Sequence, residues 1–206
     1  MTMENSLDNL LAPSLRKSIE VNLGKSTLNK IEQRLMERHG MGIGEAIKDF
    51  YKFDSVLREF FGAGADGLES KFLQNIIDLK QHKKSADNWV TVQDQELAKT
   101  FLESFADEDK KAIIGTITEK SLIISDILEQ CKVPQTSGYR KINQMIESGL
   151  LISHECETGA DGKKIKKYET VFNNVKMDLE KNKVVVKIQL KEGSMVQSSI
   201  LQIVRV

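Results

Sequence analysis

The 206-residue sequence has little that would support disulfide bonding or membrane insertion. It has two cysteines, Cys131 and Cys156, too few for the disulfide framework of a small secreted domain, which favours a reducing compartment. No apolar run approaches the roughly 20 residues that a bilayer-spanning helix needs. The first residues, MTMENSLDNLL, lack the basic region and apolar core of a signal peptide. We therefore expect a cytoplasmic protein with no membrane partner.

The sequence also lacks the motifs of catalysis. It has no phosphate-binding loop, no metal-binding triad and no nucleophile with a base at a readable spacing. His154 and Cys156 are two residues apart on one predicted strand, but two ligands do not make a metal site. We therefore expect a protein that is not an enzyme and that holds no cofactor and no metal.

The formal net charge of the chain is zero, but the charges are unevenly distributed along the sequence. The chain has 30 Lys and Arg and 30 Asp and Glu. Residues 86–109 contain 1 basic and 7 acidic residues, whereas residues 110–206 contain 16 basic and 11 acidic residues. A basic C-terminal half favours a polyanionic partner for that half alone, although many solvated faces are basic.

One segment, FFGAGADGLES, has the Gly-x-Gly-x-x-Gly spacing of a dinucleotide-binding loop. Such a loop follows a buried strand, but the apolar residues in 44–61 recur at three- and four-residue steps, which predicts a helix. Gly62 stands where a helix ends with positive φ, and Asp66 with Glu69 resembles a capping box for the next helix. The glycines therefore predict a corner between two helices.

The same helical periodicity extends over residues 14–80, which we predict to be a four-helix unit. The stretch from NLGKSTLNKIEQ to LESKFLQNI resembles a small helical output domain of archaeal signalling and regulatory proteins, and LREFFGAGADGLE is its most specific part. The resemblance implies a regulatory or oligomerising module that other transcription or signalling proteins could contact.

Residues 81–106 are predicted to be a linker and a connecting helix. The helical period breaks between residues 80 and 95, with a short extended piece at Trp89–Val92. The amphipathic segment DQELAKTFLESF follows, and its apolar stripe fits either a dimer seam or packing on its own domain.

Residues 107–192 carry the functional prediction. Residues from Asp107 read as a first helix, Ser125 as the N-cap of a second, and TSGYRKINQMIESG as a third, ended by Gly149. Two strands around Asp161-Gly162 then form a β-hairpin. The order predicts a winged helix-turn-helix, so the fold class is mainly α with a β-hairpin wing (α+β).

The second helix of such a pair enters the major groove of DNA, and the wing reaches phosphates or the minor groove. Gly138 faces inward on this helix, where its lack of a side chain permits close approach to the preceding helix or to DNA. Lysines on an exposed hairpin also serve solubility alone. The predicted DNA-binding residues are Gln135, Thr136, Ser137, Tyr139, Arg140, Lys141, Asn143, Gln144, Lys163, Lys164 and Lys166.

The stretch SDILEQCKVPQTSGYRKINQMIESGLL resembles archaeal winged-helix transcription regulators of the ArsR-like class. The resemblance implies sequence-specific binding of double-stranded DNA as a homodimer, although the cysteine-rich metal motif of many such sensors is absent. A protein-interaction adaptor is the alternative, because winged helices also serve as docking modules.

The remaining residues are predicted less fully. Alternating residues after the wing indicate a second hairpin that extends the wing's sheet, up to about residue 192. Residues 193–206 are an apolar tail that would not remain free in water, and both a strand and a dimerisation helix fit it.

Overall fold

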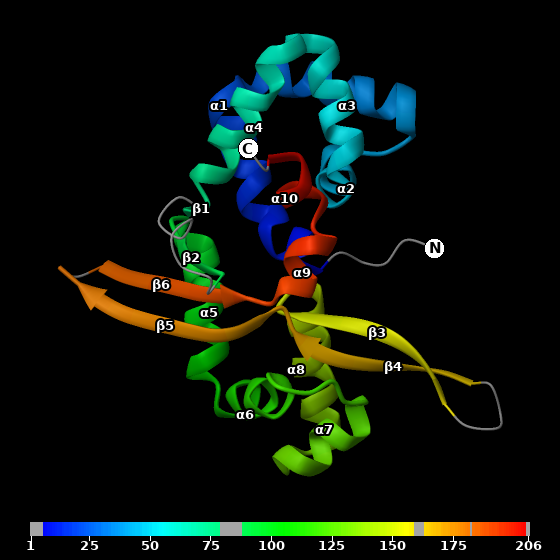
Figure 1. Cartoon of the computed structure of the whole chain (residues 1–206), viewed down its shortest axis with the longest axis vertical. Helices are drawn as coiled ribbons and strands as arrows, with labels where there is room; N and C mark the ends of the chain where they lie inside the picture. The colour runs from blue at the N-terminus through cyan, green and yellow to red at the C-terminus, as the bar shows by residue number, and fades with distance from the viewer. Residues whose placement is uncertain (1–5, 79–87, 159–162, 182, 205–206) are drawn as a thin grey trace.

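The computed structural model describes residues 6–78, 88–158, 163–181 and 183–204, and it has a mixed α+β architecture. A helical body at one end is joined through a small sheet to a second group of helices at the other end (Figure 1). Two hairpins project from the middle of the molecule in opposite directions (Figure 1). The predicted α+β class is confirmed.

The helical body is formed mainly by the N-terminal third of the chain. The sequence predicts a helix from about Ser14 to Leu23 that ends at Gly24, and Gly24 does interrupt the first helix, with φ 75°. The helix begins at Ser6, however, earlier than the predicted start near residue 14, and it continues through Pro13. The elements are α1 (Ser6–His39), α2 (Ile43–Lys48), α3 (Phe50–Phe61), a 3₁₀ turn (Gly62–Gly64) and α4 (Ala65–Gln74).

The glycine corner between α3 and α4 is confirmed, because a helix precedes it and Gly62 has φ 54°. The predicted capping box is wrong. Asp66 lies inside the first turn of α4, where it forms an ion pair with Arg58. Glu69 is only 1% exposed. Helix α4 begins at Ala65, before the predicted N-cap Asp66, and Ala65 is buried.

A four-stranded antiparallel sheet follows the helical body, in the order β1–β2–β6–β5. The hairpin predicted to follow the wing is present, but it lies in a different sheet from the strands of the predicted wing. One edge of β6 pairs with β5 and the other with the segment predicted as a linker, where Val90 lies opposite Ile188. The strands are β1 (Ile77–Asp78), β2 (Trp89–Val92), β5 (Phe172–Glu180) and β6 (Lys183–Leu190).

Helix α5 (Gln95–Ala106) connects this sheet to the second group of helices. Asp94 caps it by accepting a hydrogen bond from the Leu97 backbone N–H at 2.9 Å. Its apolar stripe is buried within the same chain, and the Phe101 ring lies 5.6 Å from the Phe172 ring, centroid to centroid. Of the two roles considered for this stripe, packing on its own chain is the one observed.

The C-terminal tail forms two short helices, α9 (Glu192–Gln197) and α10 (Ser199–Val204), which return to the helical body (Figure 1). Ile200 and Leu201 are buried there. Of the two conformations considered for the tail, the helix is therefore the one observed, and it packs against α1, α3 and α4 of the same chain.

Asp8 fixes the tail to the start of α1. Its carboxylate accepts hydrogen bonds from the Ser198 hydroxyl at 2.5 Å and from the Ser199 backbone N–H at 2.9 Å. Burial raises the pKa of Asp8 above its ordinary value, although these hydrogen bonds oppose the rise. The two ends of the described chain are therefore joined in one hydrophobic core.

Candidate nucleic-acid interface

The second group of elements contains three helices and a hairpin. The hairpin strands pair from Leu151↔Thr170 to Thr158↔Lys163, and its turn lies outside the described residues. Leu122 adds an isolated bridge, exchanging backbone hydrogen bonds with Tyr168 at 2.7 and 3.1 Å. The elements are α6 (Glu108–Ile117), α7 (Ile124–Cys131), α8 (Gln135–Glu147), β3 (Leu151–Thr158) and β4 (Lys163–Thr170).

A tight turn joins α7 to α8. Lys132 ends α7 with φ 57°, and the Val133 N–H donates to the Leu128 carbonyl at 3.2 Å. Pro134 then holds an extended φ and ψ just before the first residue of α8. Ser125 does not cap α7 as predicted, because the helix begins one residue earlier, at Ile124.

Gly138 is buried where α8 crosses α7. A Cβ atom added there would lie 2.3 Å from Leu128 Cδ2 and 3.2 Å from Leu128 Cγ. The predicted close approach of this glycine to the preceding helix is therefore confirmed. Leu128 is itself buried, so the two helices hold each other in one relative orientation.

We expect Gly138→Ala to lower the free energy of unfolding by about 1 kcal/mol. Overpacking costs about 1–3 kcal/mol, which exceeds the gain of up to about 1 kcal/mol in helix propensity. Gly115→Ala in α6 is the matched control, since nothing lies within 4 Å of an added Cβ. It should stabilise by about 0.5–1 kcal/mol. Urea unfolding of both variants measures the difference, and equal stabilisation by both would contradict the close packing.

The outer face of α8 presents most of the residues predicted to bind DNA. The inner face buries Ile142 and Met145, which fixes the rotation of the helix. Ser137 is half-buried, and its hydroxyl donates to the Pro134 carbonyl at 3.1 Å. The exposed predicted residues of this helix, which we call the α8 face, are Gln135, Thr136, Tyr139, Arg140, Asn143 and Gln144.

Lys141 differs from the other predicted residues of α8. Its ammonium lies 2.6 Å from Asp107 Oδ1 and 2.9 Å from Asp109 Oδ2, and its side chain is 15% exposed. The hydrogen bond from Lys141 lowers the pKa of Asp107. The Asp107 carboxylate also caps α6, because it accepts hydrogen bonds from the backbone N–H groups of Asp109 and Lys110. Lys141 therefore fastens α8 to α6, and its charge is neutralised within the chain.

The predicted wing residues lie on β4. Lys166 is exposed, and its backbone position is opposite that of Glu155 on β3. The side chains of Lys163 and Lys164 lie outside the described residues.

At the base of the hairpin, His154 Nε2 lies 2.6 Å from Glu169 Oε1, and Lys191 Nζ lies 2.6 Å from the other oxygen of Glu169. Burial tends to raise the pKa of Glu169, but the contacts with Lys191 and His154 outweigh it and lower the pKa below its ordinary value. In the described part of the chain, no three His, Cys, Asp or Glu side chains form a group that could hold a metal ion.

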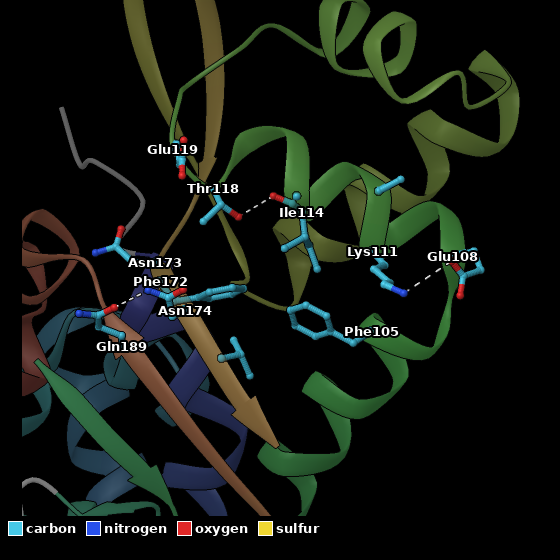
Figure 2. Close-up of a pocket in the computed structure, with 13 residues that line it drawn as sticks. Phe105, Glu108, Lys111, Ile114, Thr118, Glu119, Phe172, Asn173, Asn174 and Gln189 are labelled. Atoms are coloured by element: carbon cyan, nitrogen blue, oxygen red, sulfur yellow. Dashed lines mark hydrogen bonds and ion pairs between the residues drawn. The ribbon is translucent and has the colours of Figure 1, made fainter. Parts of the chain in front are cut away.

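An open groove of about 880 Å³ lies between α6 and the start of β5 (Figure 2). Phe105 and Phe172 form its apolar floor, and Lys111 lies on its α6 wall. Asn174 on the opposite wall donates to Gln189 at 2.6 Å. The groove lies apart from the α8 face, because none of the residues of that face lines it.

Compared with known proteins, the chain matches no protein-family profile, no curated protein and no solved structure. None of the helices within the described ranges combines the length and the apolar character that crossing a membrane requires.

Proposed function

We propose that α6, α7, α8, β3 and β4 form a winged helix-turn-helix and that the protein is a sequence-specific DNA-binding transcriptional regulator. The α8 face carries the proposal: six exposed side chains with hydrogen-bonding capacity stand on one helix that is held by a tight turn and a buried inner face. Gln and Asn bind adenine edges with two hydrogen bonds, and Arg binds guanine or phosphate. The helical body would then serve as the regulatory module.

The wing would contribute contacts to the DNA backbone. Lys166 is exposed at a position where a hairpin running along the duplex meets phosphates. The slope of log K against log salt should report the number of these contacts, since each phosphate contact contributes about −0.9 to it.

A protein-interaction adaptor is the second candidate, and charge compensation favours it. Residues 107–172 contain 10 Lys and Arg and 11 Asp and Glu, so this unit lacks the excess positive charge typical of DNA-binding domains. Lys141 is neutralised by two aspartates. An adaptor would bind a protein through the same face without measurable affinity for duplex DNA.

Fluorescence anisotropy with fragments of duplex DNA at low salt separates the two candidates. We expect binding that weakens as salt rises, and a loss of about 5- to 150-fold for Arg140→Ala. Lys30→Ala is the control, because Lys30 is an exposed lysine on α1 in the helical body. Absence of binding at low salt, or equal losses for both variants, would contradict the proposed function.

A further inference from the structure

Strand β5 forms the end of its sheet. Within the described part of the chain it pairs only with β6, so the backbone N–H and C=O groups along its other side have no strand partner. An exposed edge strand is a template for pairing with another chain, and proteins usually cover it or shorten it. Strand β5 is long instead, with nine residues from Phe172 to Glu180.

One face of this edge strand is apolar and incompletely covered. Val175, Met177 and Leu179 alternate along β5 and lie opposite β6 residues that are also apolar. Val175 and Met177 are half-buried, whereas Leu179 is 79% exposed, more than any other large hydrophobic residue whose side chain the structure describes. Apolar side chains beside an open edge mark a surface that another element covers.

The sequence of β5 is complementary to itself when two copies run antiparallel about Met177. In that register Lys176 lies opposite the partner's Asp178, and Val175 lies opposite the partner's Leu179. Opposite charges and apolar pairs at directly opposed positions each stabilise an antiparallel pair. Lys176 lies on the polar face, and in the single chain its ammonium is directed toward β2, 4.5 Å from the centroid of the Trp89 ring, so pairing requires it to turn toward the open edge.

Both neighbouring registers place like charges opposite each other, which the register about Met177 avoids. Centring the pair on Lys176 opposes the two Lys176 side chains, and centring it on Asp178 opposes the two aspartates, although it also places Lys176 opposite the partner's Glu180. Like charges directly opposite each other destabilise a pair. The charge pattern therefore selects the register about Met177.

We propose that two copies of this chain associate through antiparallel pairing of their β5 strands, which makes one continuous sheet across a two-fold axis at Met177. The axis makes the interface isologous, as in most soluble homodimers. The β5–β6 hairpin points away from the β3–β4 hairpin (Figure 1), so the pairing leaves the proposed wing uncovered.

The groove between α6 and β5 accommodates the end of the partner strand. In the register about Met177, the partner's Glu180 lies opposite Asn174, and the partner's Lys181 lies opposite Asn173. Both asparagines line the groove, whose volume of about 880 Å³ leaves space next to the edge at this end of β5 (Figure 2). The same partner thus accounts for the open edge, the exposed leucine and the groove.

Light scattering coupled to size exclusion, on the full chain without DNA, tests the pairing. We expect a mass twice that of one chain, and a monomer for Asp178→Lys, which places Lys176 opposite lysine. The double variant Lys176→Asp, Asp178→Lys should restore the dimer, because it exchanges the charges and keeps them complementary. Val21→Lys on α1, where the valine is 77% exposed, should leave the dimer intact.

Circular dichroism of each variant establishes that the fold is retained. A monomeric wild type at every concentration would overturn the proposal. A dimer that survives Asp178→Lys would also overturn it, as would failure of the folded double variant to recover the dimer. Because DNA is absent, these outcomes are independent of the proposed DNA binding.

Discussion

Replacing Phe172 with alanine is expected to lower the free energy of unfolding by about 3–5 kcal/mol, the range for a buried aromatic residue. Phe172 is 1% exposed, and its ring lies 5.6 Å from that of Phe101 and 6.4 Å from that of Phe105, centroid to centroid. It stands between the hairpin β3–β4 and the sheet that contains β5 (Figure 2). The cavity left by Phe172→Ala would therefore lie at the junction of the sheet with the helices.

Urea unfolding measures this effect, with two variants for comparison. Phe172→Leu retains most of the side-chain volume and should cost less than half as much. Phe61→Ala removes an aromatic residue that is 36% exposed, and it should cost little because that ring already contacts solvent. A loss below about 1 kcal/mol for Phe172→Ala would contradict its place in the shared core.

Raising the pH from 4.5 to 8 is expected to destabilise the protein through Glu69. Burial raises the pKa of Glu69 from 4.5 to about 8, and the nearby Asp54 carboxylate acts in the same direction. The folded state thus holds a proton that the unfolded chain releases, and stability falls by up to about 1.4 kcal/mol per pH unit in this window.

The comparison with Glu69→Gln isolates this contribution. Glutamine has nearly the same shape and does not titrate, so its free energy of unfolding should change less between pH 4.5 and 8 than that of the wild type. Glu103→Gln, at a glutamate whose side chain is 65% exposed, should keep the wild-type slope. Parallel pH profiles for wild type and Glu69→Gln would show that Glu69 is ionised in the folded protein.

Local patterns predicted much of the fold because they depend on neighbours in sequence. Helical spacing and the turn before Pro134 gave α8 within a residue at its start, and Gly138 indicated the close contact with α7. Gly24 and Gly62 marked interruptions of helices, because positive φ favours glycine.

Contacts between distant residues could not be read in the same way. Nothing near Lys141 in sequence indicates its ion pair with Asp107, 34 residues away. On one side β6 pairs with β2, which lies almost a hundred residues earlier in the chain. The sequence of β2 is too short to predict that this strand pairs inside the sheet. The sequence did not decide the conformation of the C-terminal tail, because the tail is held by Asp8, which lies 190 residues from Ser198.

The two proposals differ in what they require of the molecule. DNA binding depends on the α8 face, whose side chains are exposed at the end away from the helical body. Dimerisation depends on β5, which carries none of those residues. Together they would present two α8 helices to a palindromic site, as two-fold symmetric DNA-binding dimers do.

Selection of bound duplexes from a random pool tests the central claim, that the α8 face reads base sequence. The wild type should enrich one sequence, and Gln144→Ala should relax the preference at one position of that sequence while preserving the others. Failure to enrich any sequence would contradict the account. So would a sequence preference that is the same for the wild type, Gln144→Ala and Arg140→Ala.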